Sequence, residues 1–505
     1  MGKVDNQIII GSFIKKLREK RSLTQDELTQ RLNTSQSAVA RIENGGQNLT
    51  AGELLKIGDA LEHKIVSLSD SIDFKISGGK KLKGSIKTNF SKNGAMGLLC
   101  ASLLNQNTTI LHGIPRIEEV SRMLEIFSAL GVKYRWLKKQ SLEINPPKNF
   151  NKNGLLHSSV ANVRSSLMLI PAMVHHFKNF SLLHSGGCKM GERTISAHRF
   201  AFEDLGISIK TMNDRYGISS GSLKTADVVM YEASDTATEN AIMIAALIPG
   251  KTIIRFAPPN YQVQEVCFFL EKLGVKIEGI GTTDLIVHGI KKINQKIEYY
   301  NSEDPIESMM FLSAAIATNS KLKIERCPID FLRLELTKLK AMGLMYSLSK
   351  EYPAQNGKTK LVDITVFPSK LKALRDKIHA QPYPGINSDN LPFFVPVATL
   401  AEGTTLIHDW MWENRAIYFT ELNRLGANIT LADPHRVFIT GPTKLKPAQV
   451  VCPPALRPAM IILIAMLAAP GVSILRNVYS INRGYEDVVQ RLNSIGASIE
   501  KITGA

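Results

Sequence analysis

One glycine-rich loop in this sequence carries a cysteine together with residues that could polarise it. Gly186 and Gly187 precede Cys188. Arg193 lies five residues after the cysteine and His198 lies ten residues after it. Because a nearby cation favours the thiolate, such a loop could bring a polarised cysteine to an anionic ligand. A lone cysteine is more often a small buried hydrophobic residue, so the loop alone leaves both interpretations open.

The segments on either side of this loop have the patterns of regular structure. Residues 180–183 form an apolar run that predicts a strand, and residues 198–205 have the pattern of a helix. The loop is therefore expected to connect a strand to a helix.

The composition is that of a soluble globular protein with room for two to four domains. The chain has 505 residues, of which 44% are hydrophobic and 21% are charged. Its start lacks the pattern of a signal peptide. The most apolar run, residues 459–472, is shorter than the roughly 18 residues needed to span a bilayer and predicts a core helix. No membrane insertion is expected.

Cysteine usage and charge narrow the compartment and the partners. The five cysteines include no C-x-x-C pair, which predicts neither a disulfide framework nor a zinc site and favours a cytoplasmic location. The formal net charge of +17 favours anionic partners, either nucleic acid or phosphorylated metabolites. Residues 1–66 hold 10 Lys and Arg against 8 Asp and Glu, a net charge of +2, which leaves +15 for the remainder.

Residues 1–66 have the pattern of a small helical domain. Thr24 and Glu27 form a capping box at the start of its second helix. Residues 33–35 predict the tight turn that follows. The predicted helices are residues 8–20, 24–32, 36–43 and 50–61.

This helical pattern resembles the helix-turn-helix of the Cro/phage-repressor family. In that family the third helix enters the major groove, which implies that Gln36, Ser37 and Arg41 lie near base edges. The same resemblance implies that Gln25 lies near a phosphate, and DNA is therefore a candidate partner. The alternative is a docking or dimerisation module, because a net charge of +2 is modest for DNA binding and a single module binds weakly.

From Gly84 onward one unit recurs six times: a β-rich run, a loop, and a helix that ends at a glycine. The β-rich runs are residues 109–112, 180–183, 252–255, 321–324, 405–408 and 472–475. The glycines are Gly131, Gly206, Gly274, Gly343, Gly426 and Gly496, spaced by 75, 68, 69, 83 and 70 residues. Each glycine can act as a left-handed helix cap. Units of this length are too long for a solenoid and suggest two lobes of three units each.

The sixfold repeat and the Gly-Gly-Cys loop together resemble the enolpyruvyl transferases, over residues 75–505, and within them the members that act on UDP-N-acetylglucosamine. The resemblance implies an α/β fold with two lobes, an inside-out α/β barrel of six βαβαββ-like units, preceded by the all-α helix-turn-helix domain of residues 1–66. It also implies that lobe one spans about residues 92–303 and that lobe two combines residues 75–91 with residues 304–505.

The activity that the resemblance implies is transfer of the enolpyruvyl group of phosphoenolpyruvate to the 3-hydroxyl of UDP-N-acetylglucosamine, with release of phosphate. This is the first committed step of peptidoglycan synthesis. The hydroxyl attacks the enol carbon as the methylene carbon is protonated, and loss of phosphate restores the double bond. An acid and a base on opposite lobes require lobe closure before either can act. Neither a metal nor an organic cofactor is needed.

The implied ligand carries a phosphate and a carboxylate, so its site needs several fixed cations. The residues that match the family's cations are Lys92, Arg164, Arg193, Arg415, Arg457 and Arg483, each of which taken singly would more often be a solvated surface charge. The resemblance makes Cys188 the acid and Asp389 the candidate base. Lys92, Arg457 and Arg483 complete the implied catalytic set. The residues implied to bind substrate are Asn93, Arg164, Arg193, His198, Asp304, Glu307 and Arg415.

Three positions depart from the family's pattern. Ser196 stands where the family has an Asp that helps to hold the nucleotide, Glu232 where it has a Lys beside the diphosphate, and Pro305 where it has an Arg. None of the three belongs to the phosphoenolpyruvate set. The same chemistry with a different acceptor is therefore an alternative.

Two other functions, transcriptional regulation and the shikimate-pathway activity, are alternatives to this one. A transcriptional regulator whose transferase-like body senses a nucleotide sugar would need no acid, so Cys188 and Asp389 favour an enzyme. The shikimate-pathway relatives do not use a Gly-Gly-Cys loop, which disfavours that activity.

Overall fold

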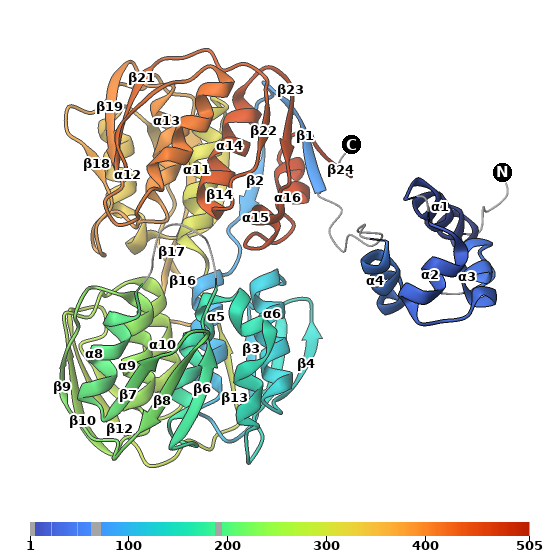
Figure 1. The fold of residues 1–505 in the computed structure, drawn as a ribbon. Coiled ribbons are helices and arrows are strands. Elements are labelled where there is room, and N and C mark those ends of the chain that lie inside the picture. The colour runs from blue at the N-terminus through green and yellow to red at the C-terminus, as the bar shows by residue number, and fades with distance from the viewer. Residues whose placement is uncertain (1–5, 22, 48, 62–71, 187–193, 504–505) are drawn as a thin grey trace. The chain divides into compact units, whose positions relative to one another are not determined.

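The structure, a computed structural model, describes residues 6–21, 23–47, 49–61, 72–186 and 194–503. It divides into two compact units (Figure 1). One unit contains the four N-terminal helices, and the other spans Asp73–Ile502.

The N-terminal unit is a bundle of the four predicted helices, whose pattern is confirmed. The helices are α1 (Asn6–Lys20), α2 (Gln25–Leu32), α3 (Gln36–Glu43) and α4 (Ala51–Ala60). Thr24 and Thr50 each form a capping box, at the starts of α2 and α4. Asn33 ends α2 in the left-handed conformation, with φ of 49°. The buried core consists of Ile14, Leu28, Val39, Ile42, Ile57 and Leu61.

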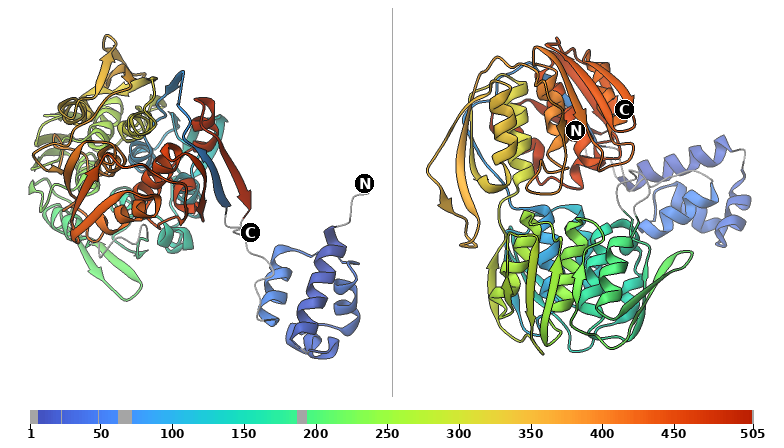
Figure 2. Two further views of the ribbon diagram at one scale, coloured as in Figure 1. Left: turned by 90° about the horizontal axis from the view of Figure 1, so that it is seen from above. Right: turned by 90° about the vertical axis from the view of Figure 1, so that its left-hand side faces the viewer.

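The large unit forms two lobes (Figures 1 and 2). Each lobe has its own hydrophobic core. The core of lobe one consists of residues between Ala95 and Tyr299. The core of lobe two combines residues from Phe74 to Ile86 with residues from Ile306 to Ile499. Lobe two is thus built from both ends of the unit, and its first strand pairs antiparallel with β23, with Phe74 opposite Leu475.

Lobe one contains three sheets, with strand orders β13-β3-β5-β4, β6-β8-β7 and β11-β12-β10-β9. Its strands are β3 (Thr109–His112), β4 (Lys133–Lys138), β5 (Ser141–Asn145), β6 (Asn179–Leu183), β7 (Ile207–Thr211), β8 (Arg215–Ser220), β9 (Asp227–Val229), β10 (Gly250–Arg255), β11 (Lys276–Glu278), β12 (Asp284–Gly289) and β13 (Ile297–Tyr300). Its helices are α5 (Lys92–Ser102), α6 (Glu118–Ala129), α7 (Ile170–Met173), α8 (Ser196–Asp204), α9 (Asp235–Ala245) and α10 (Tyr261–Lys272), with short 3-10 helices η1 (Lys152–Leu156), η2 (Ser158–Asn162) and η3 (Arg164–Leu169).

Lobe two also contains three sheets, with strand orders β22-β23-β1-β24, β15-β17-β14-β2 and β18-β19-β21-β20; β16 pairs with β17. Its strands are β1 (Ile72–Gly78), β2 (Ser85–Lys87), β14 (Leu322–Pro328), β15 (Met345–Leu348), β16 (Tyr352–Pro353), β17 (Lys360–Phe367), β18 (Ile378–His379), β19 (Gly403–His408), β20 (Asn428–Asp433), β21 (Arg436–Gly441), β22 (Gln449–Val451), β23 (Gly471–Arg476) and β24 (Ile499–Thr503). Its helices are α11 (Pro305–Ala317), α12 (Arg333–Ala341), α13 (Phe394–Ala398), α14 (Leu456–Ala468), α15 (Tyr479–Asn482) and α16 (Val488–Ser494), with η4 (Ile329–Phe331), η5 (Leu391–Phe393) and η6 (Ala416–Leu425).

The predicted sixfold repeat is confirmed by the positions of its strands and glycines. The six β-rich runs correspond to β3, β6, β10, β14, β19 and β23. The six helix-stop glycines all have positive φ, between 85° and 101°. At Gly206 an added Cβ would also lie only 2.4 Å from the carbonyl oxygen of Ser222, so glycine is required for space as well as for conformation.

Two buried and mostly apolar helices form the centre of lobe two. Every residue of α11 is buried, and so is nearly every residue of α14, which contains most of the predicted core helix. Among the described residues, no helix is long and apolar enough to cross a membrane.

Candidate active site

Two segments of the chain cross between the lobes, and they are paired with each other. Residues 88–91 follow the edge strand β2 of lobe two, and residues 301–304 follow the edge strand β13 of lobe one. The backbone N–H of Ser91 donates to the carbonyl of Ser302 over 2.8 Å. Because the crossings are held together, the helices that follow them, α5 and α11, begin close to each other.

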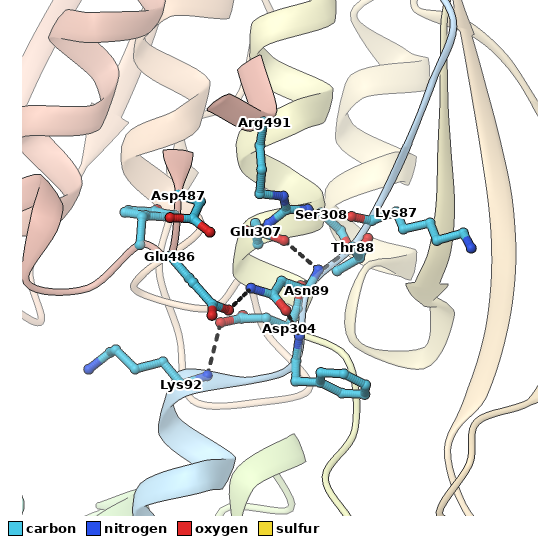
Figure 3. A network of polar contacts seen from close by, with 12 residues as sticks. Lys87, Thr88, Asn89, Lys92, Asp304, Glu307, Ser308, Glu486, Asp487 and Arg491 are labelled. Carbon is cyan, nitrogen blue, oxygen red and sulfur yellow. Dashed lines mark hydrogen bonds and ion pairs between the residues drawn. The ribbon is translucent and has the colours of Figure 1, made fainter. Parts of the chain in front are cut away.

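The starts of α5 and α11 bring polar groups together at the crossing (Figure 3). Lys92 is the first residue of α5, and its backbone N–H lies 3.4 Å from Oδ2 of Asp304. Asp304 caps α11 by accepting from the backbone N–H of Ile306 over 2.8 Å. A helix start carries partial positive charge, so this place attracts anions.

Two of the predicted cations, Lys92 and Arg483, pair with one carboxylate, that of Glu119. Nζ of Lys92 lies 2.5 Å from Oε2 of Glu119, and Nε of Arg483 lies 3.9 Å from Oε1. Burial alone would raise the pKa of Glu119, but Lys92, then Arg483 and Arg457, hold the pKa below its ordinary value. Glu119 is therefore the counter-ion of Lys92, Arg483 and Arg457, and we call these four residues the cationic pocket. Sequence reasoning missed it, because an acidic residue in the first turn of a helix is ordinary.

Asp389, the candidate base, pairs with Arg457 at the start of α14. Nη2 of Arg457 lies 3.2 Å from Oδ2 of Asp389, and Nη1 donates to the hydroxyl of Tyr485 over 2.7 Å. Burial alone would raise the pKa of Asp389, but Arg457, then Arg415 and Lys92, hold the pKa below its ordinary value. The carboxyl group is therefore ionised at neutral pH, as a proton acceptor must be. Tyr485 carried no sequence signal.

The guanidinium group of Arg415 is fully buried and is held within lobe two. Its Nε lies 2.5 Å from Oδ2 of Asp409, and its Nη2 lies 2.8 Å from Oδ1, which makes a two-pronged ion pair. Nη2 also donates to the carbonyl of Ser388, the residue before Asp389, over 2.7 Å. In this structure Arg415 anchors the loop that carries Asp389, and its contact with substrate stays a prediction.

The two predicted acidic residues at the crossing, Asp304 and Glu307, belong to a hydrogen-bonded network (Figure 3). Oε2 of Glu307 accepts from the backbone N–H of Asn89 over 2.5 Å, and Oε1 accepts from Arg491. Burial raises the pKa of both carboxyl groups, although Arg457 opposes this at Asp304 and Arg491 opposes it at Glu307. Both side chains thus fix the crossing, and their contact with substrate stays a prediction.

Asn93, in α5, contacts a residue of α10. Its Nδ2 donates to the hydroxyl of Tyr261 over 2.9 Å. The ring of Tyr261 meets the ring of Phe331 from lobe two edge to face, with centroids 5.7 Å apart. Asn93 therefore lies where α5, α10 and lobe two meet.

Arg164 and His198 form a second group, near α8 and α9. Nη2 of Arg164 donates to the carbonyl of Thr194 over 3.1 Å. Nδ1 of His198 lies 3.0 Å from Nδ2 of Asn240, so Nδ1 is the acceptor and the proton sits on Nε2, 3.5 Å from the hydroxyl of Thr236. Burial, and then the charge of Arg164, lower the pKa of His198 to about 3. His198 is therefore neutral and cannot serve as a cation for a ligand.

The loop predictions for Cys188 and Arg193 lie outside the described residues. Of the three departures, Ser196 is the first residue of α8, Pro305 is the first residue of α11, and Glu232 is exposed before α9.

In the N-terminal unit, three of the four predicted DNA-contacting residues lie together on α3. Gln36, Ser37 and Arg41 are all exposed. Gln25 differs, because its Nε2 donates to Oε2 of Glu43 over 2.9 Å. Glu43 also pairs with Arg18, whose Nε lies 2.5 Å from Oε1. Gln25 is thus part of the network that joins α1, α2 and α3.

Within residues 6–21, 23–47, 49–61, 72–186 and 194–503, no group of three or more His, Cys, Asp or Glu side chains could hold a metal ion.

Comparison with known families and sequences gives consistent results for both units. The family model described as EPSP synthase (3-phosphoshikimate 1-carboxyvinyltransferase) matches residues 76–492, and a helix-turn-helix model matches residues 14–64. The UDP-N-acetylglucosamine 1-carboxyvinyltransferase of Treponema denticola is 36% identical over 431 residues, which cover 85% of this chain and 99% of the relative. The enzyme of the same name from Bradyrhizobium diazoefficiens is 31% identical over 438 residues, 85% of this chain and 98% of the relative.

Solved structures share the fold at low sequence identity. The enolpyruvyl transferase NikO from Streptomyces tendae has a TM-score of 0.73 at 22% identity, covering 86% of this chain and 99% of that one. An EPSP synthase from Acinetobacter baumannii has a TM-score of 0.64 at 19% identity, covering 85% of this chain and all of that one. The two-lobed architecture predicted for residues 75–505 is confirmed by these matches.

Proposed function

Since the chain belongs to the EPSP synthase family of enolpyruvyl (1-carboxyvinyl) transferases and carries an N-terminal helix-turn-helix domain, we propose that it transfers the enolpyruvyl group of phosphoenolpyruvate to the 3-hydroxyl of UDP-N-acetylglucosamine. Phosphate is the second product. UDP-N-acetylglucosamine is the acceptor for which both relatives are named, and it would make the reaction a step of peptidoglycan synthesis.

One observation carries the proposal: Lys92 and Arg483 pair with the carboxylate of Glu119, and Arg457, whose charge also acts on Glu119, pairs with the ionised Asp389. A phosphate or carboxylate of the ligand could replace Glu119 as the partner of these cations. Guanidinium groups suit this task, because they bind such oxyanions through two parallel hydrogen bonds. Catalysis is favoured over sensing, since a sensor of nucleotide sugars needs no base.

The proposed reaction proceeds by addition and then elimination. Asp389 accepts the proton of the acceptor hydroxyl as its oxygen bonds to C2 of phosphoenolpyruvate, while the Cys188 thiol gives a proton to C3. The double bond is thereby consumed and C3 becomes a methyl group. The bond from C2 to the phosphate oxygen then breaks, the departing phosphate takes up the proton held by Asp389, C3 gives a proton back to the Cys188 thiolate, and the double bond returns. The cations of Lys92, Arg457 and Arg483 stabilise the phosphate as charge builds on it.

The proposal predicts acceptor-dependent phosphate release that depends on Cys188. Wild-type protein is expected to release phosphate from phosphoenolpyruvate when UDP-N-acetylglucosamine is present. Cys188→Ala is expected to lower kcat by roughly 10²–10⁴-fold, the usual contribution of a general acid. Cys267→Ala is the control, because burial raises the pKa of that thiol and it lies in the core of lobe one.

Each outcome of this assay has a distinct meaning. If the wild type releases phosphate with another hydroxyl acceptor but not with UDP-N-acetylglucosamine, the acceptor is wrong. If it releases none with any acceptor, the activity is wrong.

A different acceptor is the second candidate, and Asp235 is the observation that favours it. Oδ2 of Asp235, at the start of α9, accepts from Nδ2 of Asn260 over 2.8 Å. Burial, together with the nearby Asp389 carboxylate, raises the pKa of Asp235 to about 7. Exposed Glu232 precedes it by three residues. Glu232, and Asp235 whenever it is ionised, oppose a diphosphate at this helix start, so sugars without a diphosphate belong in the acceptor panel.

DNA is the partner that we propose for the N-terminal domain. The full chain is expected to form a salt-sensitive complex with its own upstream DNA. Arg41→Ala is expected to weaken that complex by roughly 1–3 kcal/mol, if the guanidinium group contacts a base. Gel shifts at two salt concentrations measure this change in affinity. Lys56→Ala, at an exposed position of α4, is the control. Absence of a salt-sensitive specific complex would favour a protein-docking role.

A further inference from the structure

The turn of the hairpin β4–β5 is fixed to the segment that leads into α6. This turn consists of Lys139 and Gln140, between the paired residues Lys138 and Ser141. Nε of Arg116 donates to the carbonyl of Lys139 over 2.5 Å. The backbone N–H of Ile114 donates to the carbonyl of Gln140 over 3.0 Å. The turn and the start of α6, which carries Glu119, therefore belong to one rigid part of lobe one.

The side-chain amide of Gln140 connects three segments of the chain. Its Nε2 donates to Oδ1 of Asn89 over 3.0 Å and to Oε2 of Glu486 over 2.5 Å. Nδ2 of Asn89 donates to the same Glu486 oxygen over 2.9 Å. We call these three side chains the amide triangle; Figure 3 shows its Asn89–Glu486 side. The triangle joins the lobe-one turn, the crossing, and the lobe-two loop between α15 and α16.

The carboxylate in the triangle is well suited to hold this position. Glu486 is 7% exposed, so its charge is largely removed from water. Hydrogen bonds to a buried carboxylate are stronger than those between neutral groups. An amide supplies two donors without adding charge, which a lysine at this position could not do.

The loop that Glu486 anchors is the loop that carries Arg483, three residues earlier. Nε of Arg483 lies 3.9 Å from Oε1 of Glu119, in the cationic pocket. The hydroxyl of Tyr479, at the start of α15, donates to Oε1 of Glu118 over 2.7 Å. The same part of lobe one thus contacts this loop on both sides of Arg483.

We propose that Gln140 is a positioning residue for phosphoenolpyruvate, because the amide triangle sets where the guanidinium group of Arg483 stands relative to Lys92. This inference rests on the proposed function, which makes Arg483 a ligand of that substrate. Gln140 does not touch the substrate. It acts through Glu486 on the loop, so its loss shifts the guanidinium group of Arg483 relative to Lys92 in the cationic pocket, although neither residue is itself replaced.

The test is the variant Gln140→Leu, which removes both donors and keeps the size of the side chain. The KM for phosphoenolpyruvate is expected to rise roughly tenfold, as loss of a hydrogen bond to a charged group would produce. The KM for the acceptor is expected to change by less than about twofold, since the triangle acts on Arg483, which the proposed function assigns to phosphoenolpyruvate.

The chain offers a matched control on the same turn. Nζ of Lys139 lies 3.2 Å from Oδ2 of Asp487, with side chains 72% and 47% exposed. Such exposed pairs contribute little. Lys139→Ala therefore alters the turn and an inter-lobe contact, and it is expected to leave both KM values unchanged.

A charge exchange separates positioning from general damage. Gln140→Glu alone sets a second carboxylate against Glu486, whereas Gln140→Glu combined with Glu486→Gln restores a donor and an acceptor. The double variant is expected to have a lower KM for phosphoenolpyruvate than Gln140→Glu alone. Equal KM values for Gln140→Leu and wild type, or parallel rises for both substrates, would overturn the inference.

Failure of the inference is distinct from failure of the proposed function. Wild-type protein without turnover contradicts the proposed function. Calorimetry with phosphoenolpyruvate, with and without the acceptor, then tests Gln140 directly on the same proteins. Weaker binding by Gln140→Leu supports the inference, whereas equal binding, or no binding by either protein, contradicts it.

Discussion

Replacing Asp389 with asparagine is expected to lower kcat by roughly 10²–10⁴-fold, because the amide cannot accept the proton of the acceptor hydroxyl. Asp389 is suited to that task, since the charges of Arg457, Arg415 and Lys92 hold the pKa of Asp389 below its ordinary value and keep the carboxyl group ionised. The KM for phosphoenolpyruvate is expected to change much less, because the cations of the pocket remain. Steady-state kinetics with both substrates measures the two effects separately.

A loss of kcat in Asp389→Asn could come from a damaged fold or from the missing base, and these two causes can be separated. The variant removes a charge next to Arg457, but Nη1 of that arginine still donates to Tyr485, so the local fold is expected to persist. Asp376→Asn, at an exposed position in the same lobe, is the matched control and should keep wild-type kcat. An Asp389→Asn protein that retained kcat within about tenfold of wild type would show that the base is another group.

Replacing Arg415 with leucine is expected to cost roughly 3–5 kcal/mol of unfolding free energy, the usual result of breaking a buried ion pair. The carboxylate of Asp409, which is fully buried, would be left without its two-pronged partner. Urea denaturation followed by tryptophan fluorescence reports on this region, because the Arg415 guanidinium group lies 5.2 Å from the ring centroid of Trp412.

Two further variants test whether the loss of unfolding free energy comes from the broken buried ion pair. Arg436→Leu removes an exposed ion pair with Asp433, and its cost is expected to be about 0–1 kcal/mol. Adding Asp409→Leu to Arg415→Leu removes the orphaned charge, so part of the stability should return. If Arg415→Leu were as stable as wild type, the buried pair would not hold the Asp389 loop.

The fold was largely predictable because it is a repeat. Six glycines that end helices recur at nearly constant spacing, and all six have positive φ in the structure. Local rules also sufficed for the N-terminal helices, since Thr24 and Thr50 cap the helices that they begin. Repetition and capping are encoded in nearby residues, so one sequence is enough to find them.

The candidate site was only partly predictable, because its partners are distant in sequence. Gln140 and Glu486 are 346 residues apart, and neither has a distinctive neighbourhood. Glu119 has the same difficulty at shorter range, since its partner Lys92 lies 27 residues away. Arg415 shows the converse: its motif identified a cation, but only the structure reveals that Asp409 holds it. The roles of Cys188 and Arg193 stay predictions.

Running the proposed reaction in deuterium oxide tests whether phosphoenolpyruvate undergoes addition followed by elimination at C3. If C3 becomes a methyl group and then loses a proton, the vinyl methylene of the product must acquire solvent deuterium. Proton nuclear magnetic resonance and mass spectrometry of the product measure this. We expect partial deuteration of that methylene, with release of one phosphate per acceptor consumed. A product without deuterium, or an acceptor that gains the phosphoryl group instead, would contradict it.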